Sequence, residues 1–188
     1  MTERASLPSS SSSQSFSKGL VQIFTGDGKG KTTAALGTVI RALGHGRRVF
    51  IVVFMKGDYP YGEWEVLSKL PNIGIARFGT EAFTDPENIK PEEKEQAKQA
   101  LMAAREAILG GNYDLVVLDE VNIAVAWKLV ELGEVTKLIR DKPENVELIL
   151  TGRYADEELV KMANLVTEMR KIKHPYDEGI KAREGIEY

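Results

Sequence analysis

The sequence predicts an α/β fold with a mostly parallel central sheet and helices on both faces. Short apolar runs alternate with longer amphipathic segments from Leu20 onward, which is the order expected of strands followed by crossover helices. The run Val49 to Phe54 is apolar without interruption, as in a strand buried on both faces of a parallel sheet. We expect this strand to lie beside the first strand.

The elements follow in order along the chain. We expect strands at residues 20–24, 49–54, 73–78, 115–118, 146–150 and 165–172, and helices at 31–43, 91–109 and 156–163. The first helix is stopped by Gly44. The second carries an apolar stripe at helical spacing, formed by Ala97, Leu101, Ala104 and Ile108. The polar stretch after residue 172 is expected to be irregular.

The composition excludes several classes of protein. The chain has 188 residues, of which 43% are hydrophobic and 28% charged, and this fits one globular domain. It contains no cysteine, which excludes disulfides and thiolate-bound zinc. A formal net charge of −3 provides no broad basic surface, so nucleic acid is not an expected partner. No apolar stretch is long enough to span a membrane.

The first 17 residues form a separate region by composition. They contain a serine run at 9–13 and few large apolar side chains, so they cannot bury enough surface to fold alone. We interpret residues 1–17 as a flexible tail and residues 18–188 as the folded domain. The tail lacks the apolar centre of a secretory signal, and we therefore expect a cytoplasmic protein.

A glycine-rich loop after the first strand is the strongest functional signal. Residues 25–32 read TGDGKGKT, and the closely spaced glycines let backbone N–H groups turn toward one anion. Lys31 can place its charge on phosphate oxygens, and Thr32 can offer its hydroxyl to Mg²⁺ at the start of a helix. We expect the phosphates of ATP to be bound by Gly26, Asp27, Gly28, Lys29, Gly30, Lys31 and Thr32. A single P-loop NTPase-like domain is therefore predicted, with a glycine-rich turn that binds no ligand as the alternative.

The loop departs from the common phosphate-binding pattern G-x-x-x-x-G-K-[ST] at one position. Thr25 stands where the first glycine is expected. A threonine there is either a tolerated substitution or a sign that the phosphates follow a different track. The sequence leaves both interpretations open.

An acidic pair and an arginine follow two of the buried strands. Asp119 and Glu120 end the strand at 115–118, at the edge where open α/β sheets bind ligands. We favour Glu120 as a ligand of Mg²⁺, with Asp119 as a second ligand or as its orienting neighbour; capping or solvated carboxylates are the alternative. Arg153 can reach the same crevice, although a surface ion pair is equally compatible. Arg41 on the first helix has the same two interpretations.

Six segments together resemble the P-loop type of ATP:corrinoid adenosyltransferase. They are TGDGKGKTT from Thr25, RALGHG from Arg41, MKGD from Met55, VVLDE from Val116, TGR from Thr151 and KHPYDEGIKAREGIEY at the C-terminus. The resemblance covers about residues 18–188. The C-terminal run and the threonine in the loop are more particular to this family than the loop itself, which identifies only a nucleotide-binding protein.

The resemblance implies transfer of the 5′-deoxyadenosyl group of ATP to cobalt(I) of a reduced corrinoid, with release of triphosphate, in adenosylcobalamin biosynthesis or salvage. It also implies a nucleotide bound in the reverse direction along the loop, a homodimer and a flavodoxin-like reductant. Lys31, Thr32 and Glu120 are then catalytic, with Thr32 and Glu120 at Mg²⁺, and Arg41 and Arg153 lie near the nucleotide. A kinase or NTPase acting at the γ-phosphate is the main alternative. A nucleotide-binding regulatory module that turns nothing over is another.

The family often places the motif Phe-Thr-Trp against the corrinoid, where it helps to displace the lower cobalt ligand. The matching residues are Phe83, Thr84 and Asp85, so the phenylalanine is kept and the tryptophan is not. Phe83 is the expected corrinoid contact, with an ordinary core anchor as the alternative. Aromatic residues that could compensate for the missing tryptophan are Tyr59, Tyr61 and Trp64.

Overall fold

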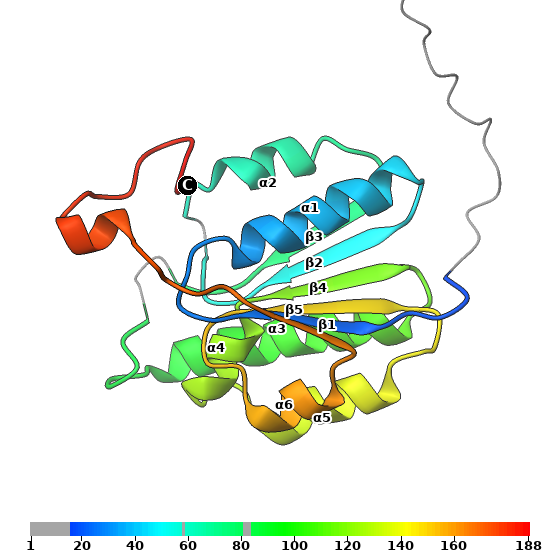
Figure 1. The fold of residues 1–188 in the computed structure, drawn as a ribbon. Coiled ribbons are helices and arrows are strands. Elements are labelled where there is room, and N and C mark those ends of the chain that lie inside the picture. Colours follow the sequence, from blue (N-terminus) through cyan, green and yellow to red (C-terminus); the bar gives the residue numbers. More distant parts are fainter. Residues whose placement is uncertain (1–15, 58, 81–83) are drawn as a thin grey trace, which may run out of the picture.

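The core of the protein is a six-stranded parallel sheet in the order β3-β2-β4-β5-β1-β6 (Figure 1). The computed structural model describes residues 16–57, 59–80 and 84–188. The strands are β1 (Val21–Thr25), β2 (Val49–Val53), β3 (Ile73–Arg77), β4 (Leu115–Asp119), β5 (Glu147–Thr151) and β6 (Leu165–Glu168). The predicted α/β class with a parallel sheet is confirmed.

Helices cover both faces of the sheet, as predicted (Figure 1). The helices α1 (Lys31–Gly44) and α2 (Gly62–Leu67) lie on one face. The other face carries α3 (Pro91–Leu109), α4 (Val121–Ala126), α5 (Leu132–Asp141) and α6 (Glu157–Met162). A short 3₁₀ helix, η1 (Pro175–Glu178), interrupts the C-terminal segment. No helix in the three described ranges is both long and apolar enough to cross a membrane.

The strands feed two separate cores because successive side chains point to opposite faces of a sheet. Ile51 and Val117 belong to the cluster that packs under α1 and α2, whereas Val52 and Leu118 belong to the cluster that packs under α3, α4, α5 and α6. Because both clusters are apolar, the central strands have apolar residues on both faces and do not alternate between apolar and polar residues. This burial explains the uninterrupted Val/Ile/Phe run of β2.

The predicted position of β2 beside β1 is wrong. β2 pairs with β3 on one side and with β4 on the other, and both β4 and β5 lie between it and β1. Burial on both faces identifies an internal strand but does not name its neighbours, since all five residues of β4 are buried as well. The chain therefore leaves β1 and enters the sheet again three strand positions away, and the later strands β4 and β5 fill the two positions between.

The remaining predicted strands and helices are present, with small differences at their ends. β6 ends at Glu168, short of the predicted residue 172. Three helices were not predicted, namely α2, α4 and α5. The sequence of α4, VNIAVA, is buried over most of its length and therefore shows no amphipathic period.

The sheet brings the ends of β1, β4 and β5 together at one edge. Phe24 of β1 is in register with Thr151 of β5, and Leu118 of β4 is in register with Leu150 of β5. The loop after β1, the acidic residues after β4 and the turn after β5 therefore emerge side by side. This edge is where ligands bind in open α/β sheets.

Leu148 is fully buried, so Leu148→Ala leaves a cavity where the leucine side chain was. We expect this substitution to lower the free energy of unfolding by about 2–5 kcal/mol. Val166→Ala on the edge strand β6 is the matched control, since Val166 is 41% exposed. Its cost is expected to stay within about 0.5 kcal/mol. Denaturant unfolding measures both, and equal losses would contradict the assignment of β5 to the sheet centre.

Candidate functional site

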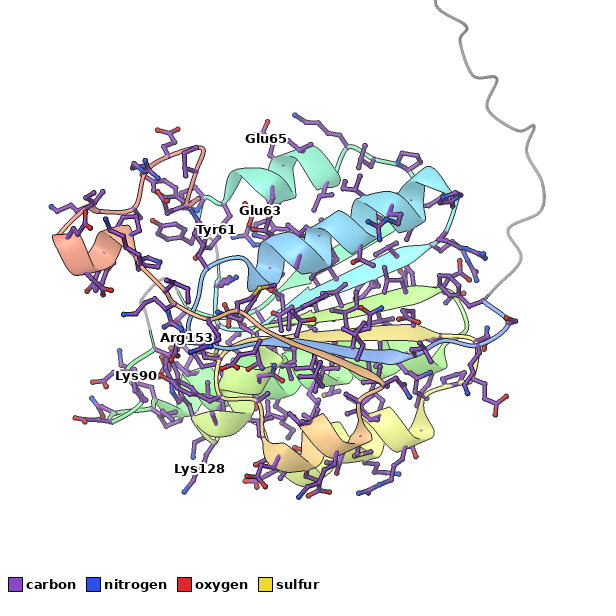
Figure 2. All side chains as sticks on the ribbon, viewed as in Figure 1. Tyr61, Glu63, Glu65, Lys90, Lys128 and Arg153 are labelled. Atoms are coloured by element: carbon purple, nitrogen blue, oxygen red, sulfur yellow. The ribbon has the colours of Figure 1, made fainter. Side chains whose placement is uncertain are left out.

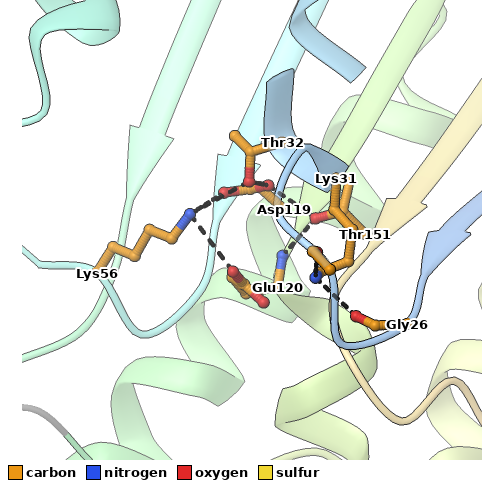
Figure 3. Close-up of polar contacts among 8 residues, drawn as sticks. Gly26, Lys31, Thr32, Lys56, Asp119, Glu120 and Thr151 are labelled. Carbon is orange, nitrogen blue, oxygen red and sulfur yellow. Dashed lines mark hydrogen bonds and ion pairs between the residues drawn. The ribbon is translucent and has the colours of Figure 1, made fainter. Parts of the chain in front are cut away.

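The loop between β1 and α1 closes around the side chain of Lys31. The Nζ of Lys31 donates hydrogen bonds to the carbonyl oxygens of Gly26 and Gly28, each at 2.7 Å (Figure 3). Gly30 has a φ of 117°, in the region that other residues rarely adopt, and it is the last residue before the helix. Burial lowers the pKa of Lys31, an effect that the carboxylate of Glu120 opposes. The loop therefore holds a lysine ammonium where a phosphate chain is expected.

The glycine at position 28 is required by a close backbone contact. Its N–H donates to the carbonyl oxygen of Met169 at 2.6 Å. A Cβ at this position would lie 2.7 Å from the same oxygen and 2.9 Å from the carbonyl carbon of Arg170. The segment that follows β6 therefore packs directly against the loop at Gly28 and fixes the position of the loop.

Asp119 links the loop to three strands of the sheet. Its carboxylate is fully buried at the end of β4. Oδ1 accepts hydrogen bonds from the hydroxyls of Thr32 at 2.8 Å and Thr151 at 2.7 Å, and Oδ2 accepts one from the Nζ of Lys56 at 2.7 Å (Figure 3). A buried carboxylate is stable only with such partners. Asp119 thus holds the hydroxyl of Thr32 in place, which is neither of the two roles predicted for it, a second metal ligand or a residue that orients Glu120.

Glu120 directs its carboxylate toward the open side of the site. Its backbone φ is 65°, an uncommon conformation for a residue other than glycine and one that is often found at functional sites. Its N–H donates to the Thr151 hydroxyl at 2.9 Å, and its Oε1 lies 3.5 Å from the Nζ of Lys56. Burial and the neighbouring charge of Asp119 raise the pKa of Glu120. The side chain nevertheless keeps 22% of its surface exposed, so a ligand can reach it.

Two cavities meet at these residues. One, of about 300 Å³, is lined by Lys31, Met55, Lys56, Tyr61, Thr84, Glu120, Ile123, Trp127 and Arg153. The other, of about 650 Å³, is lined by residues 29–33, 36, 56, 61–63, 66, 120 and 185–188. Lys31, Lys56, Tyr61 and Glu120 line both cavities. The charged centre of the site is therefore shared by two adjoining spaces.

The oxygen groups at this centre fit Mg²⁺. Thr32 supplies a hydroxyl, Asp119 and Glu120 supply carboxylates, and Mg²⁺ prefers such oxygen ligands. No group of three or more His, Cys, Asp or Glu side chains in the described ranges is arranged so that it could hold a metal ion alone. A cation held by one or two carboxylates together with phosphate oxygens matches this donor set.

Not all of the predicted site residues are brought together. Arg153 is exposed and lines the smaller cavity, at the same end of the sheet as Tyr61 (Figure 2). Arg41 lies in the last turn of α1 and lines neither cavity. It follows Lys31 by ten residues, or about 15 Å of helix axis. No contact among the described residues of this chain places Arg41 near the expected nucleotide site.

The predicted corrinoid contact, Phe83, lies outside the described residues. Its neighbour Thr84 lines the smaller cavity. Asp85, which stands in place of the family's tryptophan, is exposed and accepts a hydrogen bond from the N–H of Glu87 at 3.0 Å. Of the aromatic residues that could compensate, Trp64 is buried in the core under α2, whereas Tyr61 lines both cavities.

The sequence reasoning missed Lys56, which contacts both carboxylates. Lys56 follows the end of β2, and β2 pairs with β4 so that Val53 is opposite Asp119. Its ammonium lies 5.2 Å from the centre of the Tyr61 ring. The rule that ligands bind at strand ends applies to β2 as it does to β4, and it could have identified this lysine within the MKGD segment.

The C-terminal segment folds over the loop. The Nζ of Lys29 donates to the carbonyl oxygen of Ile186 at 3.1 Å and to Oε1 of Glu187 at 2.8 Å. Hydrogen bonds from Arg183 and Lys29 hold the pKa of Glu187 well below its usual range. The ring of Tyr188 packs edge-on against Tyr59 at 5.5 Å. The last residues of the chain thus form one wall of the larger cavity.

The family model for ATP:corrinoid adenosyltransferase BtuR/CobO/CobP matches residues 17–188. The chain belongs to this family. It is 39% identical to a corrinoid adenosyltransferase of Sinorhizobium sp. over 175 residues, which are 91% of this chain and 81% of the relative. It is 37% identical to the corrinoid adenosyltransferase CobA of Salmonella typhimurium and 35% identical to the corrinoid adenosyltransferase of Escherichia coli K12, and each match covers 91% of this chain and 86% of the relative.

Membership in the adenosyltransferase family agrees with the positions of the motifs that resemble it. The glycine-rich loop, Lys56, the acidic pair and the TGR segment all lie at one edge of the sheet. The C-terminal run contacts the loop at Lys29 and the segment after β2 at Tyr59. Segments far apart in the sequence therefore belong to a single site.

We expect Gly28→Ala to weaken ATP binding by roughly tenfold to a hundredfold. The added methyl group must displace the Met169 carbonyl or the loop, and such overpacking costs about 1–3 kcal/mol. Gly37→Ala in α1 is the matched control, because a Cβ there meets no atom within 4 Å and favours the helix. Calorimetric titration with ATP distinguishes them, and unchanged affinity in Gly28→Ala would contradict the role of this contact.

Proposed function

We propose that this protein transfers the 5′-deoxyadenosyl group of ATP to cobalt(I) of a reduced corrinoid and releases triphosphate. Family membership supports this proposal. The observation that carries it is the convergence of Lys31, Thr32 and the Asp119–Glu120 pair at the junction of two cavities. A site with this arrangement can hold a polyphosphate on one side and leave its sugar end open to a second substrate.

The reaction requires the protein to stabilise a leaving group. Cobalt(I) attacks the ribose C5′ carbon, the C5′–O bond breaks, and its electron pair leaves with the triphosphate. Cobalt(I) supplies both electrons of the new cobalt–carbon bond, so the step needs no other oxidant or reductant. Negative charge grows on the oxygen that departs. The loop amides and the ammonium of Lys31, which lies within the loop, would stabilise that charge.

A metal ion completes the phosphate site in this proposal. Thr32 and Glu120 would hold Mg²⁺, with Asp119 orienting Thr32. Bound there, Mg²⁺ would neutralise charge on the triphosphate. None of these protein groups acts as a nucleophile, and none is needed because the attacking atom belongs to the corrinoid.

The smaller cavity is the proposed approach for the corrinoid. It is lined by the apolar side chains of Met55, Ile123 and Trp127, and by Thr84 next to Phe83. At about 300 Å³ it is too small to enclose a corrin ring, so a second surface must cover the substrate. We propose that a second copy of the chain or the residues before position 18 provide it. The homodimer, the flavodoxin-like reductant, the cytoplasmic location and the nucleotide roles of Arg41 and Arg153 belong to this proposal.

The test of the proposed function is a product analysis. With ATP, Mg²⁺ and prereduced corrinoid, we expect triphosphate and a light-sensitive cobalt–carbon bond to form in equal amounts. Chromatography of the nucleotide products and the visible spectrum of the corrinoid measure the two. ADP and phosphate without a cobalt–carbon bond would indicate a γ-phosphate enzyme instead. ATP binding without any product would indicate a regulatory module.

We expect Lys31→Met to lower kcat by about a hundredfold to a thousandfold, as when one preorganised donor to a developing anion is removed. Lys161→Met on α6 is the matched control. Lys161 is an exposed lysine that pairs with Glu157 and lines neither cavity, so kcat is expected to change little in this variant. Steady-state kinetics with prereduced corrinoid compares the two variants, and losses of equal size would rule out a special role of Lys31.

A further inference from the structure

We propose that Lys56 is a resident counter-ion that occupies the metal position in the nucleotide-free protein, excludes free Mg²⁺, and is displaced when the metal enters together with ATP. This inference rests on the metal and phosphate roles proposed for the site and does not depend on the identity of the adenosyl acceptor.

The geometry places the Lys56 ammonium among the groups assigned to the metal. Its Nζ lies 2.7 Å from Oδ2 of Asp119, 3.5 Å from Oε1 of Glu120 and 3.4 Å from the hydroxyl oxygen of Thr32 (Figure 3). These are the same three oxygen-bearing side chains that fit Mg²⁺. A Mg²⁺ ion bound to these oxygen atoms would lie close to the Lys56 ammonium, and two cations so close together repel each other strongly in a partly buried site. The lysine and the metal ion therefore compete for one position.

The carboxylates need a cation when no nucleotide is bound. Asp119 is fully buried, and Glu120 keeps only 22% of its side chain exposed. Leaving two adjacent carboxylates without a partner is costly in such surroundings. The ammonium of Lys56, 2.7 Å from Oδ2 of Asp119 and 3.5 Å from Oε1 of Glu120, is placed to offset part of this negative charge.

The cavities beside Lys56 give its side chain room to turn away from Asp119. Its side chain lines both cavities, as does Lys31 of the phosphate-binding loop. Its flexible four-carbon chain lets the ammonium rotate without movement of the backbone. Turned away from Asp119, it would face the phosphates from the side opposite the loop. The same residue would then serve the carboxylates before ATP binds and the triphosphate afterwards.

A permanent structural ion pair is the competing explanation, and metal binding in the absence of nucleotide separates the two. We expect nucleotide-free Lys56→Met to bind Mn²⁺, used as a paramagnetic probe for Mg²⁺, roughly tenfold or more tightly than the unchanged protein. Electron paramagnetic resonance of free Mn²⁺ measures this affinity. The removal of the competing cation is the reason for the gain. Equal or weaker Mn²⁺ binding in Lys56→Met would overturn the proposal.

Two further variants serve as controls. Lys56→Arg keeps a cation at the site and is expected to exclude Mn²⁺ as the unchanged protein does; a gain in Mn²⁺ affinity there would contradict the proposal. Lys69→Met removes a lysine that pairs with Glu65 at 2.9 Å on the surface of α2. It is expected to leave Mn²⁺ binding unchanged.

A measurement on the unchanged protein covers the case in which Lys56→Met does not fold. The nuclear magnetic resonance signal of the Lys56 ammonium is expected to shift on addition of Mg²⁺ with ATP but not with Mg²⁺ alone. A signal that stays in place with Mg²⁺ and ATP would overturn the displacement. Calorimetry distinguishes the two levels of failure: absence of any Mg²⁺-dependent ATP binding would refute the nucleotide role itself, whereas normal binding with an unmoved Lys56 would refute only this inference.

Discussion

The buried carboxylate of Asp119 is the interaction on which the site depends. It receives hydrogen bonds from Thr32 at the start of α1, from Thr151 at the end of β5 and from Lys56 after β2. Because a buried charge without partners is unstable, the Asp119 carboxylate needs hydrogen-bond donors or a cation beside it whenever the fold is intact. The position of the loop relative to the sheet is therefore set by the same contacts that assemble the candidate metal site. The burial of the Asp119 charge thus constrains both the fold and the site.

The features that could be predicted from the sequence are those set by local spacing. The glycine-rich loop, the helix that begins at Lys31 and the acidic pair after β4 each follow from neighbouring residues. The neighbours of β2 could not be derived in this way, because β2 and β4 both contain buried apolar runs and burial does not specify pairing. The role of Lys56 was missed for a similar reason. Its carboxylate partners, Asp119 and Glu120, are more than sixty residues away in the chain, and the pairing of β2 with β4 brings them to it.

The C-terminal run was identified by resemblance alone, and the structure supplies a physical reason for it. The segment after β6 presents the Met169 carbonyl to Gly28, and Glu187 contacts Lys29 on the outer side of the loop. The loop is therefore supported from two directions by residues that come last in the chain. A loop that must hold a whole departing triphosphate has more need of such support than a turn that merely connects β1 to α1. Arg41 illustrates the opposite case, since a motif residue on the first helix lies about 15 Å of helix axis beyond Lys31.

The balance of charge connects these observations to the reaction. Without nucleotide, the ammonium of Lys56 contacts the carboxylates of Asp119 and Glu120, while loop carbonyls bind the ammonium of Lys31. In the proposed reaction a triphosphate would bring several negative charges to this edge of the sheet, and these two ammonium groups would then turn from protein oxygens to phosphate oxygens. Both lysines line the cavities and can make that turn. On this proposal, the cations that stabilise the departing triphosphate are already positioned by contacts within the protein before ATP binds.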